Sequence, residues 1–345
     1  MRIVAIVPAV TEPDIDKTLR SLLNQTRPPE KILVAVNNAG DDTTLTAASR
    51  VCDPRVEVVD FGRIDGRKAG ALNAALAYVS PGVNDLVLPM DADTTMGPEW
   101  IANALDALGE SPRGRADAAG AVFLADDDTG WLRGCTAREW SRYTLTNEMK
   151  DHTHVLSGTA ALIRMSALER VRERFGDYYD ESAITEDFDL TVRLKATGSR
   201  LTSPAGCKVL TDTMDTIPDL IRQRSRWSRG AIDVVLRHGF NRTTAVYWRQ
   251  QAMLLVSILA FWSFLALTVI LTPLYGMHLS WWGLTILAVF ITERVITVWD
   301  MGLRHRLIAA ILIPEMTYAF ILQVAHIKAL VTAVKRSNMT WHHAN

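Results

Sequence analysis

Short apolar runs alternate with helical patterns over the first 125 residues of the chain. Four of these runs have the length and composition of buried strands: Ile3–Val7, Ile32–Val36, Val56–Val59 and Leu86–Leu88. The segments between them, at residues 14–24, 43–50 and 67–79, repeat apolar residues at helical spacing. Strands that alternate with helices predict an α/β fold with a mostly parallel sheet, in which ligands bind at the carboxyl ends of the strands.

The pattern changes further along the chain, where the predicted helices become longer. Helices are predicted over residues 131–150, 186–197 and 216–237, and the last of these is rich in arginine. Val155–Arg164 is predicted to form a strand that is interrupted at Ser157–Gly158.

A long apolar stretch follows, from Ala252 to Thr292, and it contains no Asp, Glu, Lys or Arg. One membrane span needs roughly 20 apolar residues, so this stretch has the length of a transmembrane hairpin. We predict spans at 252–272 and 280–300, with a pair of buried core helices as the alternative. Glu293 and Arg294 are expected to pair with each other inside the second span.

A third apolar stretch, over residues 307–333, is interrupted by Pro314 and Glu315. Basic residues stand on both sides of it, and such residues prefer the cytoplasmic face of a membrane. We therefore predict a broken third helix that does not cross. Together these patterns predict three parts: residues 1–215 as a catalytic domain, 216–250 as interface helices and 251–335 as a membrane domain.

The composition of the chain limits its possible functions and its cellular compartment. The formal net charge of −1 over 345 residues offers no overall attraction to nucleic acid. The three cysteines, Cys52, Cys135 and Cys207, have no zinc-binding spacing and are interpreted as small buried residues in a reducing compartment. The apolar run at the N-terminus is too short for a signal peptide, so the polar part is expected to stay in the cytoplasm.

Two carboxylates follow the predicted strand Leu86–Leu88. Asp91 and Asp93 are two positions apart, which places their side chains on the same side of an extended chain. Such a pair repels unless a cation lies between, and Mn²⁺ or Mg²⁺ prefers oxygen ligands and leaves places for phosphate oxygens. The alternative is a solvated acidic turn, and the position at a strand end favours the metal site.

A second acidic group, Thr185-Glu186-Asp187, opens the predicted helix 186–197. An aspartate in this position could accept the proton of an attacking hydroxyl. In the alternative interpretation Thr185 is the N-cap of the helix and the acidic residues only favour its first turn. The two roles are compatible.

Two helical segments carry cations. Gln223 and Trp227 share a helix face, and Arg226 lies beside it. A guanidinium suits a diphosphate and an indole suits a sugar ring. In the alternative interpretation this is a basic amphipathic helix that lies on anionic lipid. Lys68–Asn73 opens a helix after a strand, where phosphate can bind, or else Lys68 is a surface lysine.

Along the chain the four elements occur in the order Lys68–Asn73, Asp91–Asp93, Thr185–Asp187 and Gln223–Trp227. In this order they resemble the motifs of the family-2 glycosyltransferases, in particular the membrane branch of cellulose, chitin and hyaluronan synthases. Three further segments resemble the same family: Ile6–Ala9, Leu22–Thr26 and Ser157–Ala160. The resemblance extends over residues 1 to 240, and the predicted hairpin stands where the family places its own.

The resemblance implies a GT-A fold and an inverting transfer from a nucleotide-sugar donor. Asp187 would be the general base, and Asp91 and Asp93 would hold Mn²⁺ or Mg²⁺. The implied donor-binding residues are Pro8, Glu12, Asn38, Lys68, Asp91, Gln223 and Arg226. The implied acceptor-binding residues are Thr159, Glu186 and Trp227.

Two departures from the family pattern bear on the substrates. Asn37-Asn38 stands where the family usually carries paired aspartates, so UDP is favoured as the donor nucleotide while GDP stays open. The membrane part is short, which favours the addition of one or a few sugars to a membrane-proximal saccharide, lipid or protein. A secreted polymer would need a homo-oligomer joined through the membrane helices.

Two rival functions remain open from the sequence: a polyprenyl-phosphate glycosyltransferase, and a non-catalytic membrane protein that binds sugar nucleotides. The expected location is the inner cell membrane, as a multi-pass protein with a cytoplasmic catalytic domain.

Overall fold

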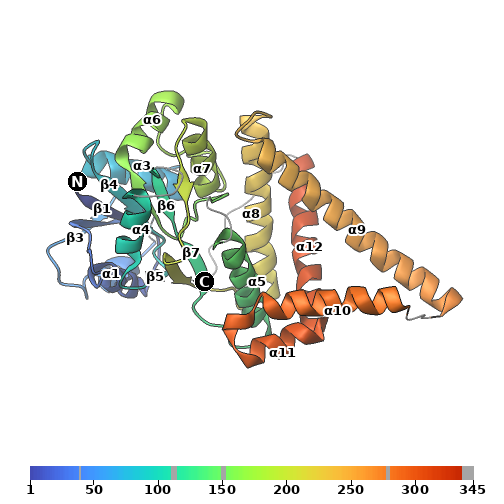
Figure 1. Cartoon of the computed structure of the whole chain (residues 1–345). Helices are drawn as coiled ribbons and strands as arrows, with labels where there is room; N and C mark the ends of the chain where they lie inside the picture. Colours follow the sequence, from blue (N-terminus) through green and yellow to red (C-terminus); the bar gives the residue numbers. More distant parts are fainter. Residues whose placement is uncertain (39, 110–114, 149–152, 277–279, 336–345) are drawn as a thin grey trace. The chain divides into compact units, whose positions relative to one another are not determined.

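The computed structural model describes residues 1–38, 40–109, 115–148, 153–276 and 280–335. The chain divides into two compact units (Figure 1). The first comprises Met1–Asp128 and Tyr143–Thr213, and the second comprises Thr129–Arg142 and the chain from Met214 onward.

The first unit is built on a seven-stranded sheet with the order β3-β2-β1-β4-β8-β6-β9. Its strands are β1 (Ile3–Ala9), β2 (Lys31–Val36), β3 (Val56–Asp60), β4 (Leu86–Pro89), β6 (Ala118–Gly120), β8 (Ala161–Arg164) and β9 (Leu201–Thr202). Strand β8 runs antiparallel to its neighbours β4 and β6, and all other pairs are parallel. The predicted α/β fold with a mostly parallel sheet is confirmed, including its first four strands.

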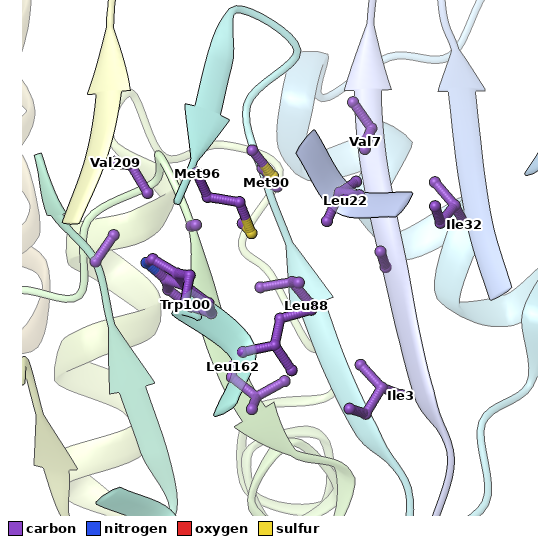
Figure 2. Close-up of a cluster of buried hydrophobic side chains, with 14 of the residues drawn as sticks. Ile3, Val7, Leu22, Ile32, Leu88, Met90, Met96, Trp100, Leu162 and Val209 are labelled. Atoms are coloured by element: carbon purple, nitrogen blue, oxygen red, sulfur yellow. The ribbon is translucent and has the colours of Figure 1, made fainter. Parts of the chain in front are cut away.

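Helices cover both faces of this sheet. One face packs against α1 (Ile15–Leu23), α2 (Thr43–Ala48) and α4 (Trp100–Gly109), and the other against α3 (Arg67–Val79), α6 (Met165–Phe175) and α7 (Glu186–Ala196). Alternation along β1 explains the division, since Ile3 and Val7 belong to one core while Val4 and Ile6 belong to the other. Figure 2 shows the first core, in which Trp100 packs close to Leu88 and Leu162.

A smaller sheet lies in the same unit, with the order β5-β10-β7. Its strands are β5 (Thr94–Met96), β7 (Val122–Ala125) and β10 (Lys208–Thr211). The predicted strand Val155–Arg164 is wrong in its first half, because only Ala161–Arg164 is a strand. The backbone N–H groups of Leu156 and Gly158 bond instead to side chains of α7.

The second unit is helical. It contains the first part of α5 (Trp131–Glu148), followed by α8 (Ile217–His238), α9 (Ala245–Tyr275), α10 (Trp281–Ile296), η1 (Trp299–Met301), α11 (Leu303–Ile311) and α12 (Ile313–Val334). The 31-residue α9 and the 22-residue α12 are long and apolar enough to cross a membrane, by length and composition. Helix α10 has 16 residues, none of them buried, and the number of helices that cross stays a prediction.

The third apolar stretch is broken as expected, but the break falls at Leu312, which adopts a left-handed backbone with φ 63°. Pro314 then lies in the first turn of α12, where its missing N–H leaves no helical bond unmade. The break therefore lies before α12, which is continuous from Ile313 to Val334.

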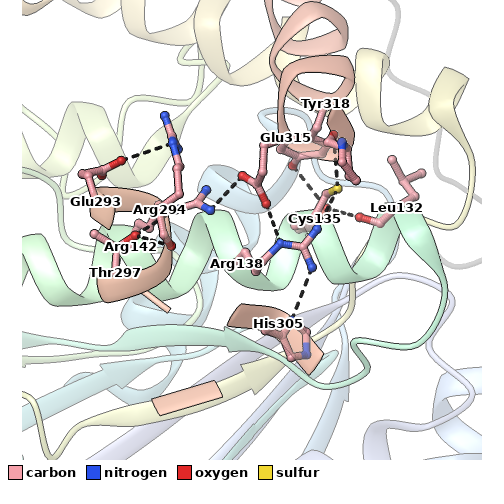
Figure 3. A network of polar contacts seen from close by, with 12 residues as sticks. Leu132, Cys135, Arg138, Arg142, Glu293, Arg294, Thr297, His305, Glu315 and Tyr318 are labelled. Carbon is pink, nitrogen blue, oxygen red and sulfur yellow. Dashed lines mark hydrogen bonds and ion pairs between the residues drawn. The ribbon is translucent and has the colours of Figure 1, made fainter. Parts of the chain in front are cut away.

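A buried ion cluster joins α5 to α12 in the second unit (Figure 3). The Glu315 carboxylate bonds Nε of Arg138 at 2.5 Å and a terminal nitrogen of Arg142 at 2.7 Å. Arg138 also lies 3.3 Å from Nδ1 of His305 on α11. Glu293 and Arg294, which we expected to pair, do so at 3.2 Å. The interpretation of all three cysteines as buried is wrong for Cys52, which is exposed.

Candidate active site

Asp91 and Asp93 stand on the loop that follows β4, at the carboxyl end of the main sheet. The backbone N–H of Asp91 donates to the carbonyl oxygen of Thr159 at 3.0 Å and so ties this loop to the segment before β8. The Thr94 hydroxyl lies 3.2 Å from Oδ1 of Asp93. Ala92 between the two aspartates is buried, while Asp93 is exposed and Asp91 is half-buried, so both reach solvent at this edge.

Further carboxylates add to the negative charge there. Surrounding protein atoms, and next the charges of Asp91 and Glu12, raise the pKa of Asp93. Burial, and then the charge of Asp212, raise the pKa of Glu12 in the same way. Asp212 was missed in the sequence, although its position directly after an apolar run, now β10, is the same signal that marked Asp91. A concentration of acidic groups with raised pKa values favours the binding of a cation.

The protein side chains at this edge can supply only part of the coordination shell of a divalent ion. Among the described residues, no group of three or more His, Cys, Asp or Glu side chains is arranged to hold a metal ion. Mn²⁺ and Mg²⁺ can be bound by only one or two carboxylates when phosphate oxygens and water complete the coordination shell. The Asp93 carboxylate is the more accessible of the two, since the Asp91 carboxylate is bonded by a lysine.

That lysine is Lys68, in the first turn of α3. Its ammonium lies 2.5 Å from Oδ1 of Asp91, 2.9 Å from Oε1 of Glu186 and 3.3 Å from the carbonyl oxygen of Gly158. Burial by itself would lower the pKa of Lys68, but Asp91 and Glu186 outweigh it and hold the pKa well above its usual value. Lys68 is therefore a paired cation inside the site, which excludes the interpretation as a surface lysine.

Asp187 opens α7 beside this lysine. Its carboxylate accepts hydrogen bonds from the backbone N–H groups of Phe188 at 2.7 Å and Gly158 at 3.1 Å. Burial, and next the charge of Glu186, raise the pKa of Asp187 to about 6, while Lys68 opposes the rise. At pH 7 the side chain is mostly ionised and is basic enough to take a proton from a hydroxyl group.

Thr185 occupies the N-cap position of α7, but its hydroxyl does not cap the helix. The Thr185 oxygen is buried and has no hydrogen-bond partner in the described part of the chain. The alternative interpretation is therefore right about the N-cap position of Thr185, but its side chain makes no capping bond. Thr159, an expected acceptor residue, is half-buried, and its hydroxyl lies 2.7 Å from that of Ser157.

The expected donor residues after β1 and β2 differ in their access to a ligand. Pro8 is buried within β1, and Asn38 is exposed with a left-handed backbone, φ 57°. Asn37 is buried, and its side-chain amide bonds the backbone of Ile64 and the carbonyl oxygen of Arg67. Asn37 therefore holds the loop before α3, and Asn38 is the member of the pair that reaches solvent.

Gln223, Arg226 and Trp227 lie on α8 in the second unit, and all three are half-buried. The guanidinium of Arg224 stands over the indole of Trp227, 4.5 Å from the ring centre. One face of this indole therefore carries a cation.

Two further arginines of α8 bear on the alternative of lipid binding. Arg222 forms an ion pair with Asp219, and Arg229 pairs with Asp233 at 2.9 Å. Their charges are balanced on the same helix, which weakens its attraction to anionic lipid.

Known proteins share this architecture. The structure is similar to a mannosyltransferase from Pyrobaculum calidifontis, PcManGT, solved in complex with GDP-Man and Mn²⁺. The TM-score is 0.63 at 17% identity, over 98% of this chain and 88% of that one. At this identity the likeness establishes the fold, which is the expected GT-A fold of glycosyltransferases.

Curated relatives agree with the fold. The chain is 26% identical over 239 residues to poly-beta-1,6-N-acetyl-D-glucosamine synthase of Staphylococcus aureus strain COL, covering 66% of this chain and 53% of the relative. It is 26% identical over 229 residues to the synthase of the same name from Staphylococcus epidermidis strain ATCC 35984, covering 65% and 52%. The chain thus spans about half the length of these relatives.

The protein is a glycosyltransferase of the GT-A fold, which confirms the class that the motifs indicated. A family model described as Glycosyl transferase family group 2 matches residues 86–322, and the chain belongs to that family.

Proposed function

We propose that the protein transfers a sugar from a nucleotide-sugar, with UDP-sugars favoured, to a hydroxyl of a membrane-proximal acceptor, with inversion at the anomeric carbon. One observation carries this proposal. The Gly158 N–H bonds the Asp187 carboxylate, and Lys68, which bonds the carbonyl oxygen of Gly158, also bonds Asp91. One lysine and one glycine therefore connect the proposed base to a proposed donor-site carboxylate.

In the proposed reaction, the acceptor oxygen attacks the anomeric carbon while Asp187 takes its proton. The new carbon–oxygen bond forms as the bond to the diphosphate breaks. A divalent ion held by Asp93 and Asp91 would offset the charge that develops on the diphosphate. Lys68 keeps Glu186 and Asp91 in place by bonding both.

The remaining residues are assigned by their motifs. Gln223 and Arg226 would bind the diphosphate, and Trp227 would contact the acceptor sugar. Glu12 and Asn38 would lie near the donor nucleotide at the carboxyl edge, and buried Pro8 would shape the strand end behind it. Thr159 and Glu186 would border the acceptor.

The curated relatives and the solved neighbour suggest which donors to test first. The curated relatives are named as synthases of an N-acetylglucosamine polymer, and the solved neighbour was bound to GDP-Man and Mn²⁺. These names support a screen that begins with UDP-N-acetylglucosamine and GDP-mannose. Acceptors in the screen would be oligosaccharides, a lipid extract and polyprenyl phosphate, so that the lipid-phosphate alternative is tested together with hydroxyl acceptors.

The decisive experiment compares three purified proteins with Mn²⁺ in detergent: the wild type, Asp187→Asn and Asp106→Asn. Asp106 is an exposed residue of α4, so its substitution controls for the loss of one negative charge. We expect transfer by the wild type and Asp106→Asn, and loss of transfer with retained donor binding in Asp187→Asn. Transfer by Asp187→Asn at the wild-type rate would remove the base from the mechanism.

We also propose that residues 251–335 anchor the protein in the inner membrane with the catalytic unit in the cytoplasm. The apolar surface of α9, whose residues are largely exposed, supports this. Cysteine labelling from either side of the membrane tests it, with Cys52 as the native reporter. We expect a membrane-impermeant thiol reagent to reach Cys52 only after the cells are opened.

A further inference from the structure

A small cavity lies beneath the proposed base, inside the first unit. Its polar lining is formed by Lys68, Ser157, Tyr179, Glu186 and Asp187, and Gly158 and apolar side chains form the larger rest. The cavity volume is about 20 Å³. A water molecule needs about 10–15 Å³ by this measure, so the cavity has room for water and is far too small for a sugar.

Tyr179 is the residue of this cavity that the proposed mechanism does not use. Its side chain is 3% exposed, and its hydroxyl lies near the charges of Lys68, Glu186 and Asp187, which also line the cavity. Burial raises the pKa of this hydroxyl, so it stays protonated and able to donate. A water molecule in the cavity can serve as a hydrogen-bond partner of this hydroxyl.

The backbone of Tyr179 is held in place by Asn73 of α3. The Asn73 side chain donates to the carbonyl oxygen of Tyr179 at 3.0 Å and accepts from its N–H at 3.1 Å. Asn73 is the last residue of the motif that begins at Lys68. The motif thus places the lysine at the top of the cavity and fixes the tyrosine at its side.

The hydrogen-bonding capacities of the polar groups decide how a water would be oriented. An ammonium has three donors, and those of Lys68 go to Asp91, Glu186 and Gly158. The carboxylates of Glu186 and Asp187 accept only. A water in the cavity would therefore donate to a carboxylate and accept from the Tyr179 hydroxyl.

We propose that this cavity is an ordered-water site and that Tyr179 positions Asp187 through that water. Tyr179 is a positioning residue, since it acts on the base and not on the substrate. The water site stands on the geometry alone, while its effect on the rate rests on the proposed function.

The test compares Tyr179→Phe with Tyr178→Phe. The neighbouring hydroxyl of Tyr178 bonds Glu169 at 2.8 Å, outside the cavity, so its removal is a matched control. Tyr179→Phe is expected to lower kcat about five- to tenfold, the effect of one lost hydrogen bond, with the donor KM unchanged. Tyr178→Phe is expected to keep kcat within twofold.

An experimental map at high resolution supplies a readout that needs no activity. We expect ordered water density between Tyr179 and Asp187 in the wild type, and its loss in Tyr179→Phe. Empty density in the wild-type cavity would overturn the proposal, and so would a Tyr179→Phe variant that keeps the wild-type kcat. If the wild type transferred no sugar at all, the proposed function would fail, while the density would still decide the water site.

Discussion

Gly158 gives the sharpest test of how tightly the site is packed. It lies on the segment that passes between Lys68 and Asp187. A Cβ added to this residue would stand 3.0 Å from Nζ of Lys68, 3.3 Å from Oδ2 of Asp187 and 3.5 Å from Cβ of Asp187. Gly158 is not among the glycines with positive φ, so an alanine would not strain its own backbone. The effect of Gly158→Ala should therefore fall on the two side chains.

The expected size of that effect follows from their contacts. The ammonium of Lys68 is bonded to Asp91 and Glu186, and it can move away only if one of these bonds lengthens. Oδ2 of Asp187 accepts from the N–H of Gly158 itself, so it can hardly retreat without loss of that bond. Displacement of a base by ~1 Å can lower a rate by ~100-fold, so a shift of a few tenths should lower kcat by about three- to tenfold.

Stability should respond less than catalysis. Overpacking by one methyl group destabilises by about 1 kcal/mol at the lower end of the usual range, and one of the crowded atoms is the end of a lysine. The control is Gly97→Ala, because a Cβ at Gly97 would meet no atom within 4 Å. Steady-state transfer and thermal unfolding would be measured for both variants. If Gly158→Ala and Gly97→Ala had the same kcat, the close packing of Lys68, Gly158 and Asp187 would have no catalytic meaning.

Three further results are expected. Glu315→Gln should destabilise the second unit by about 3–5 kcal/mol, because two buried arginines, Arg138 and Arg142, lose their shared counter-charge; an unchanged thermal midpoint in detergent would contradict this. The rate of transfer should fall as the pH drops below about 6, because Asp187 acts in its ionised form and burial raises its pKa to that value; a rate that stays flat down to pH 5 would exclude it as the base. Chelation should abolish transfer, and Asp93→Asn should raise the Mn²⁺ concentration needed to restore it; a variant with the wild-type requirement would rule out this ligand.

The sheet was predictable because its strands can be recognised from the local sequence. Ile3–Ala9 and Lys31–Val36 are continuous apolar runs, and such runs are typical of strands that are covered on both faces. The segment before β8 was not predictable in the same way. Its sequence, Val155–Ala160, has the composition of a strand, but Leu156 and Gly158 bond to side chains of a helix that begins 28 residues later than Gly158, at Glu186. The composition of a segment does not reveal such a long-range contact.

The same limit applies to the charges of the site. The sequence marks Asp91 and Glu186 as acidic residues at the ends of secondary-structure elements, but it does not reveal that one ammonium lies between them. Lys68 is 23 residues from Asp91 in the chain and 118 from Glu186, so only the folded topology brings the three together. Because Lys68 bonds both carboxylates, any ligand that draws Asp91 away would leave Glu186, and through it Asp187, as the nearest partners for the same positive charge. The donor side and the base of this site are therefore electrostatically linked, and a substitution at Lys68 should affect both at once.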